Sequence, residues 1–493
     1  MKSIYLKLTG LAGALLMMLT ALGLSHKQSP QPPLSSSSAG TSTTHQQLEN
    51  GTTNTVTSIM ITTITTGQPG ESAAATSTPS TAISDENSEN LQNQGTTSGS
   101  TVSTNTQPNK PTGGSASSST AASNTPTRPS SPVVPAPTPT PTGKIVTGYY
   151  AGWASYKGYT PDRVPVQQLT HLNYAFAKIN PSANAVALAD PANDRKNFAA
   201  LRKLKQRYGH LKTLISIGGW DYSAYFSDIA STAARRTAFA ESCLTFILEH
   251  GFDGVDLDWE YPVSGGAAGN TNRPQDKQNF TLLLKEIRRQ LDSQSARDGK
   301  TYYLTIAGAA NTSYLSKIEP QNVSPLVDYI FLMAYDFHGP WDRFADLNAP
   351  LYTPQEASPH YKSSVYDGIK AYLNKGVSAQ KIVLGMPLYG YVYQGVSKQN
   401  NGLYSAFSSA KSLSYNDLRL SYLNNTAYSR HRHEAAKVPY LYGNGTFISY
   451  EDSASISAKT ALAKSLGLAG VGVWELSQDT SGALLNSAYR TLN

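Results

Sequence analysis

The chain has 493 residues and a formal net charge of +7, with 40 Lys and Arg against 33 Asp and Glu, and it contains one cysteine. It is too long for one ordinary domain, and a single cysteine excludes any intramolecular disulfide and any cysteine-based metal cluster. The basic residues are spread along the chain rather than gathered in a run. This charge indicates loose attraction to anionic walls, and we expect no nucleic-acid partner.

Residues 1–25 have the layout of an export signal, because Lys2 and Lys7 precede an uncharged apolar run that extends from residue 8 to residue 24. The run has the upper length of a signal core and the lower length of a membrane span, and no clear small-residue cleavage site follows it. We expect an extracellular, secreted protein. A signal anchor that tethers the chain to a membrane at the cell surface is the alternative.

Residues 26–143 are mostly Ser, Thr, Pro, Gly, Asn and Gln. Before Tyr149 the only aromatic residue is Tyr5, so this segment cannot build a core that offsets its ordering entropy. We predict a disordered, Ser/Thr/Pro-rich linker. All five tryptophans follow residue 150, and residues 144–493 have the composition of a globular domain.

From residue 144 onward, short β-rich runs alternate with helical patterns. The predicted strands cover residues 144–150, 169–177, 212–218, 254–260, 302–308, 327–335, 381–387 and 469–475. The predicted helices include residues 195–208, 233–250, 275–291 and 453–466. Strands that alternate with helices form right-handed parallel β/α units, and eight of them in one domain predict an α/β fold, a closed (β/α)8 TIM barrel. Cys243 lies in a helical apolar pattern, which favours a buried core thiol.

Residues 391–450 interrupt this rhythm between the seventh and eighth strands. They are rich in Tyr, Ser and Asn, and the stretch is too long for a plain loop. We predict a small α+β insertion domain on the rim of the barrel, where it would deepen one wall of a groove.

The stretch FDGVDLDWEYP, residues 252–262, alternates acids with apolar residues. In a strand, Asp256, Asp258 and Glu260 share one face and their apolar neighbours share the other. The outer face of a β/α barrel is covered by helices, so the acids must point into the barrel. Several ionised acids would repel one another there, so some must be protonated or held by hydrogen-bond donors.

Two other interpretations of this stretch are weaker. A solvated strand face conflicts with the packed barrel interior, and a calcium loop needs a glycine turn and irregular backbone rather than an apolar alternation. No histidine is near, so we expect no metal and no cofactor. Acid–base chemistry remains: Glu260 would lie at the C-terminal mouth, where barrel active sites are found, with a pKa raised enough to act as a general acid.

DGVDLDWEYP resembles the Asp-x-x-Asp-x-Asp-x-Glu signature of the family 18 glycoside hydrolases, specifically the bacterial-type chitinases. SIGGW (216–220), MAYDF (333–337) and GVWEL (472–476) are similar to this family's motifs on the third, sixth and eighth strands, and GMPLYG and VPYLYGNGTFISYED to the edges of its insertion domain. The resemblance covers residues 144–493 and implies a glycosidase that acts on chitin or N-acetylglucosamine oligosaccharides. We expect a monomer.

The resemblance implies catalytic roles for Glu260, Asp258, Asp256 and Tyr335, in a substrate-assisted retaining mechanism. Glu260 would protonate the glycosidic oxygen. Asp258 and Tyr335 would hold the acetamide group that acts as nucleophile. Asp256 would take up a proton or a hydrogen bond when Asp258 turns toward the substrate. The substrate-binding residues would be Tyr149, Phe176, Ser216, Gly219, Trp220, Tyr261, Met333, Asp336, Trp341, Tyr389 and Trp474. Asp253 is interpreted as structural.

The aromatic residues support a sugar ligand independently. Four tryptophans fall at or just after the C-terminal ends of predicted strands, where their rings could stack on pyranose faces: Trp153, Trp220, Trp341 and Trp474.

Two positions depart from the family pattern. Tyr391 stands where an arginine is common, which puts a contact to Asp336 or to a sugar in doubt, and SYED replaces the usual Asp-Asp ending. Two alternatives stay open: an endo-β-N-acetylglucosaminidase acting on glycans or peptidoglycan, and a non-hydrolytic chitin-binding lectin.

Overall fold

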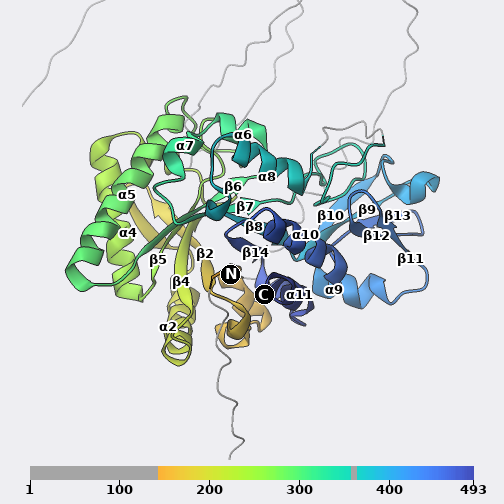
Figure 1. The fold of residues 1–493 in the computed structure, drawn as a ribbon, viewed down its shortest axis with the longest axis horizontal. Helices are drawn as coiled ribbons and strands as arrows, with labels where there is room; N and C mark the ends of the chain where they lie inside the picture. Colours follow the sequence, from red (N-terminus) through yellow and green to blue (C-terminus); the bar gives the residue numbers. More distant parts are fainter. Residues whose placement is uncertain (1–142, 357–362) are drawn as a thin grey trace, which may run out of the picture. The chain divides into compact units, whose positions relative to one another are not determined.

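The computed structural model describes residues 143–356 and 363–493, so residues 1–25 and most of the expected linker lie outside the described residues. Eight parallel strands form a closed ring in the order β1-β14-β8-β7-β6-β5-β4-β2, and β1 pairs with β2 to close it (Figure 1). The strands are β1 (Ile145–Ala151), β2 (His171–Asn180), β4 (Lys212–Gly218), β5 (Gly254–Asp258), β6 (Tyr303–Ala309), β7 (Tyr329–Met333), β8 (Ile382–Pro387) and β14 (Gly470–Trp474). The predicted (β/α)8 barrel is confirmed.

Helices surround this ring. They are α2 (Pro191–Arg207), α3 (Phe226–Ala230), α4 (Ala233–His250), α5 (Asp276–Asp298), α6 (Thr312–Ser316), α7 (Pro320–Val323), α8 (Val365–Asn374), α10 (Ser453–Ser465) and α11 (Ala483–Leu492). In the connection from β1 to β2, three short 3-10 helices replace a long α-helix: η1 (Gly152–Lys157), η2 (Pro161–Arg163) and η3 (Val166–Gln168). A short strand, β3 (Ala185–Leu188), pairs antiparallel with β2.

Strand β5 separates two cores. The side chains of Val255, Leu257 and Trp259 are buried in the large outer cluster between the strands and the helices. A second cluster fills the barrel interior and includes Tyr149 and Phe331. The alternation in the sequence is therefore the alternation between these two surfaces of the barrel wall.

Helix α4 shows how the local sequence determines where a helix begins and ends. Thr232 caps its start by accepting a hydrogen bond from the backbone N–H of Arg235, and Gly251 ends it in the left-handed conformation at φ 77°. Cys243 is fully buried in this helix, as predicted, and burial raises the pKa of its thiol.

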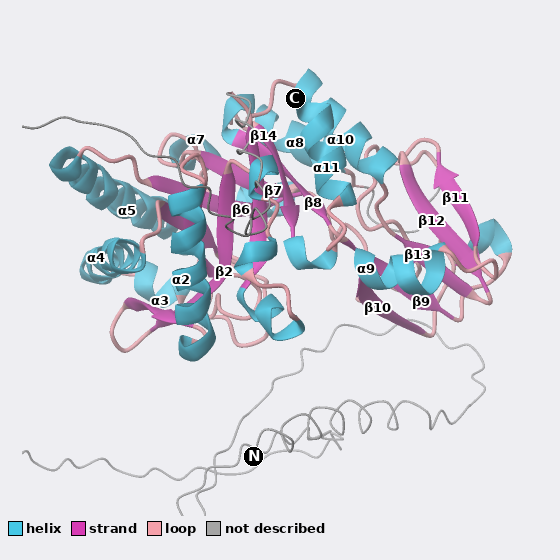
Figure 2. Cartoon of the chain, turned by 90° about the horizontal axis from the view of Figure 1, so that it is seen from below, coloured by secondary structure: helices cyan, strands magenta, loops and turns pink. Residues whose placement is uncertain are grey.

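The insertion between β8 and α10 is a five-stranded antiparallel sheet in the order β10-β9-β13-β12-β11, beside the barrel in both views (Figure 2). Its elements are β9 (Tyr389–Gln394), β10 (Ser409–Ser414), α9 (Tyr415–Leu418), the π-helix η6 (Arg419–Leu423), β11 (Ser429–His433), β12 (Val438–Gly443) and β13 (Thr446–Ser449). One face of this sheet packs on the loop that follows β7. None of the helices in residues 143–356 and 363–493 combines the length and hydropathy of a membrane span.

Candidate active site

Asp256 lies at the centre of the barrel interior. The register of β4, β5 and β6 places Ser216, Asp256 and Thr305 at one level of the ring. The carboxylate accepts hydrogen bonds from the hydroxyls of Ser216 at 2.8 Å, Thr305 at 2.6 Å and Tyr149 at 2.8 Å. Burial raises the pKa of Asp256, and the hydroxyl donors oppose that rise. Asp256 is therefore a fixed carboxyl with its hydrogen bonds supplied by the protein.

Asp258 is two residues further along β5, on the same face and buried. Its Oδ1 atom is buried and has no hydrogen-bond partner among the described residues. The pKa of Asp258 is raised well above its ordinary value, first by burial and then by the neighbouring Glu260 and Asp256 carboxyls. A buried acceptor without a donor is costly, so this oxygen is available to a donor that arrives with a ligand.

Glu260 lies just past the end of β5 and is half-buried. Its backbone N–H donates to the Ser223 hydroxyl at 2.9 Å, and its carbonyl accepts from the Asn270 amide at 2.7 Å. Burial raises the pKa of Glu260 to about 7; the Tyr261 hydroxyl opposes this rise, and the Asp336 carboxyl adds to it. Near neutral pH the side chain is therefore in the range where it can give and take a proton.

The turn after β4 fits closely against this strand. The backbone N–H of Gly219 donates to the carbonyl of Asp258 at 2.8 Å, and the Ser223 hydroxyl donates to that same carbonyl at 3.1 Å. Gly219 has φ of 74°, and a Cβ atom there would lie 2.6 Å from the ring of Phe176. Glycine is needed here because both the backbone conformation and the approach of the Phe176 ring exclude a side chain.

Aromatic rings form the surface beside the acids. Trp474, at the end of β14, stacks on Phe176 with ring centroids 5.5 Å apart and meets Tyr149 edge-on at 5.4 Å. Met333, half-buried at the end of β7, packs against the same interior cluster. The predicted residues Tyr149, Phe176, Met333 and Trp474 are thus brought together by four different strands.

Tyr335 and Asp336 follow β7. Tyr335 is half-buried, and its pKa is raised well above the ordinary value, first by burial and then by the Asp258 carboxyl. The Asp336 carboxylate accepts hydrogen bonds from the hydroxyl of Tyr389 and, at 2.7 Å, from the hydroxyl of Tyr391. The departure from the family pattern at residue 391 therefore does not remove the contact to Asp336, because the tyrosine hydroxyl makes it.

Three of the four rim tryptophans are exposed: Trp153 by 46%, Trp220 by 53% and Trp341 by 62%. Trp153 also lies 6.3 Å from Phe176, and Trp341 meets Tyr391 edge-on at 5.8 Å. Large exposed indole rings at a site mouth are surfaces on which an apolar sugar face can stack.

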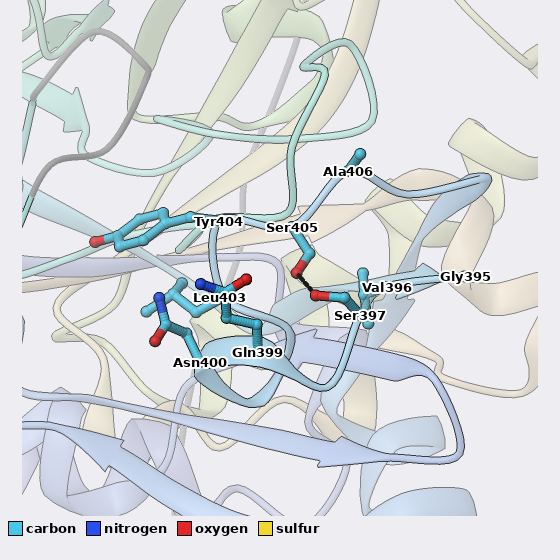
Figure 3. A pocket seen from close by; sticks show the side chains of 9 residues that line it. All are labelled: Gly395, Val396, Ser397, Gln399, Asn400, Leu403, Tyr404, Ser405 and Ala406. Atoms are coloured by element: carbon cyan, nitrogen blue, oxygen red, sulfur yellow. Dashed lines mark hydrogen bonds between the residues drawn. The ribbon is translucent and has the colours of Figure 1, made fainter.

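A separate hollow of about 540 Å³ lies in the insertion, in the connection from β9 to β10 (Figure 3). Its lining includes Ser397 and Ser405, whose hydroxyl oxygens are 2.7 Å apart, and none of the predicted site residues. The chemistry of the acids places the candidate site at the barrel mouth instead. Within the described residues no cluster of three His, Cys, Asp or Glu side chains is arranged to hold a metal.

Known proteins match this sequence and this fold. The sequence model for "Glycosyl hydrolases family 18" matches residues 145–479. The chain belongs to family 18 of the glycosyl hydrolases. It is 40% identical to chitinase A1 of Niallia circulans over 417 residues, which are 73% of this chain and 60% of that relative.

Solved family 18 structures are similar. Chitinase ChiA74 from Bacillus thuringiensis has a TM-score of 0.68 at 35% identity, over 71% of this chain and 70% of that chain. A family 18 N-acetylglucosaminidase from Paenibacillus barengoltzii has a TM-score of 0.65 at 35% identity, over 71% of this chain and 100% of that chain. The predicted membership of family 18 of the glycoside hydrolases is confirmed.

Two residues that bind the acids of the candidate site were not predicted from the sequence. Thr305 completes the donors to Asp256, and Ser223 binds the backbone of both Asp258 and Glu260. Thr305 had a detectable signal, since it lies on the interior face of a predicted strand. Ser223 had none, because a serine in a loop takes its partners from the three-dimensional arrangement. Asp253, interpreted as structural, forms an ion pair with Lys205 at 2.7 Å.

Proposed function

We propose that this family 18 enzyme hydrolyses the β-1,4 bonds between N-acetylglucosamine units of chitin. The observation that carries the proposal is the pairing of a buried Asp258 oxygen that lacks a donor with Glu260, whose pKa is about 7. Such a pair suits a ligand that brings both an N–H group and an oxygen that needs a proton. An N-acetylated glycoside brings both, and the similar proteins from Niallia circulans and Bacillus thuringiensis are named chitinases.

In the first step, Glu260 gives its proton to the glycosidic oxygen as the bond to the anomeric carbon breaks. The carbonyl oxygen of the substrate's own acetamide attacks that carbon and forms an oxazolinium ion, the substrate-assisted variant of glycoside hydrolysis. Water then opens this ion while Glu260 takes back a proton. The anomeric configuration is retained because the carbon is displaced twice.

Asp258 orients the acetamide group. Its free oxygen accepts the acetamide N–H, which aligns the carbonyl and stabilises the positive charge that develops on the ring. Tyr335, whose pKa is raised by burial and by the Asp258 carboxyl, donates its hydroxyl hydrogen to the acetamide oxygen. Asp256 stays held by its hydroxyl donors. When Asp258 turns toward the substrate, Asp256 takes up the proton or hydrogen bond that the two carboxyls share.

The aromatic surfaces hold the sugar chain. Trp474, stacked on Phe176, forms the floor beneath the distorted sugar, and Asp336 contacts the sugar beside the cleaved bond. Trp220 and Trp341 are the exposed rings on which neighbouring sugars stack.

A second candidate is an N-acetylglucosaminidase that acts on other glycans, and the similar Paenibacillus barengoltzii structure carries that description. The insertion sheet favours chitin, because it extends the wall beside Asp336 and Trp341 and suits a long chain. A lectin would need no proton donor, and Glu260 is present with its aspartates.

Product analysis on N-acetylglucosamine oligomers, with Glu260→Gln as the paired variant, tests the proposal. We expect the wild type to release short oligomers. The variant should bind the same oligomers but turn over at least about a hundredfold more slowly, since a general acid contributes about 10²–10⁴. Equal hydrolysis by both proteins would refute the assignment. Release of sugar from N-glycans but not from chitin oligomers would favour the second candidate.

We also propose that the chain is exported and acts as a monomer, on the basis of its N-terminal apolar run and dispersed charge. Fractionation of cells that express the full chain should place activity in the medium. Activity that stays with the membrane would indicate the uncleaved anchor instead, and a dimer in light scattering would contradict the monomer.

A further inference from the structure

The insertion sheet is tied to the loop that carries Asp336. In that loop, the backbone N–H of Ala345 donates to the carbonyl of Ser405 at 2.7 Å, and the N–H of Tyr404 donates back to the carbonyl of Ala345 at 2.8 Å. Ala345 and Leu347 pack in one buried cluster with the tyrosines of β9. The loop and the sheet therefore form one packed unit beside the site.

Asn348 links this unit to the backbone of Asp336. Asp336 has φ of 56°, a left-handed conformation that is uncommon for a residue with a side chain. Its backbone N–H donates to the Asn348 side-chain oxygen at 2.8 Å, and the Asn348 N–H donates to the Ser449 hydroxyl of β13 at 2.8 Å. Asn348 is 2% exposed, so these bonds are shielded from water.

The side chain of Asp336 is held by hydroxyls rather than by a cation. Tyr389 and Tyr391, alternate residues of β9, both donate to Oδ1 of Asp336. Burial raises the pKa of Asp336, and the hydrogen bonds from the two tyrosine hydroxyls oppose that rise by favouring the charged form. In the part of the chain that the structure describes, no Lys or Arg acts on this carboxylate. The bonds fix where the carboxylate lies and leave its negative charge without a compensating positive charge.

We propose that Tyr391, together with Asn348, is a positioning residue through which the insertion fixes Asp336 at the site with its negative charge uncompensated. This inference rests on the proposed function of Glu260 as the proton donor. Tyr391 acts through Asp336 and is not itself a catalytic residue.

The consequence concerns the proton on Glu260. The titratable groups that act on Glu260, or are acted on by it, come from the ends of β4, β5 and β7 and from α6, and they are Asp221, Asp258, Tyr261, Tyr314, Tyr335 and Asp336. All of them are acids or phenols, so an uncompensated Asp336 favours the protonated form of Glu260. A cation placed beside Asp336 should have the opposite effect.

The test compares two substitutions in the full chain. Tyr391→Arg puts a positive charge beside Asp336, so the alkaline limb of the kcat/KM profile on chitin oligomers should move to lower pH by about half a unit or more. Tyr391→Phe keeps the ring and removes one hydrogen bond to a charged group. Its kcat/KM should fall about tenfold, with the alkaline limb unmoved.

Tyr393→Phe is the matched control. Tyr393 lies two residues along β9 on the same face, and its hydroxyl is outside the bonds that hold Asp336, so kcat/KM should stay within about twofold of the wild type. Circular dichroism confirms that each variant is folded. If Tyr391→Arg does not fold, Tyr391→Phe decides the inference by its loss of kcat/KM.

The possible failures are separable. Equal hydrolysis by the wild type and Glu260→Gln would refute the proposed function. If activity depends on Glu260 while a folded Tyr391→Phe matches the wild type, only the positioning role is overturned. A folded Tyr391→Arg whose alkaline limb does not move would overturn it equally.

Discussion

Raising the pH from 6 to 9 should inactivate the enzyme by removing the proton from Glu260. The pKa of this carboxyl is raised by burial from its ordinary value of 4.5 to about 7, a rise that corresponds to about 3 kcal/mol in favour of the protonated form. About half of the enzyme then holds the proton at pH 7, about a tenth at pH 8 and about a hundredth at pH 9. An unperturbed glutamate would hold it in only about 0.3% of molecules at pH 7.

The assay is kcat/KM on a chitin oligomer, measured by the release of reducing ends at each pH. Because the acid must be protonated, activity is present below pH 7 and should fall about tenfold per pH unit above it. Circular dichroism at pH 9 separates this loss from unfolding. An alkaline limb near pH 5, or constant activity up to pH 9, would show that the surroundings of Glu260 do not hold its proton.

Two further substitutions test the frame around the site. Gly219→Ala should lower kcat/KM and destabilise the fold by at least about 1 kcal/mol, because the added Cβ would meet the Phe176 ring and the backbone there is left-handed. Gly209→Ala is the control: a Cβ at that position has no atom within 4 Å, so neither quantity should change. Wild-type kinetics for Gly219→Ala would contradict this. Lys459→Met should lower the free energy of unfolding in urea by about 3–5 kcal/mol. The native Lys459 ammonium binds the buried Glu451 carboxylate at 2.6 Å, and the substitution leaves that carboxylate buried without its partner. Adding Glu451→Leu should restore much of this loss, and an additive second loss would argue against the pair.

The sequence was sufficient for the features that depend on periodicity. The alternation in β5 predicted that Asp256 and Asp258 point into the barrel, and both are buried there. Tyr149 and Ser216, which the resemblance placed among the site residues, both donate their hydroxyls to Asp256. Strand positions transfer well because a closed parallel barrel fixes which residues lie at one level.

Contacts made by irregular segments could not be predicted from the sequence. The 3-10 connection after β1 carries no long apolar repeat that could identify it. Asn348 binds Asp336 and β13, which are 12 and 101 residues away, and one polar residue in a loop gives no sign of either partner. The bond from Tyr391 to Asp336 likewise depends on how the insertion packs on the loop after β7. Such partners follow from tertiary packing, which local sequence does not encode.

Partially deacetylated chitin oligomers test the central claim most directly, because the acetamide is either the nucleophile or it is not. The new reducing ends released by the wild type should be sequenced by mass spectrometry. If Asp258 and Tyr335 present the acetamide to the anomeric carbon, N-acetylglucosamine should occupy essentially every new reducing end. Glucosamine at these ends in proportion to its content in the substrate would contradict the account.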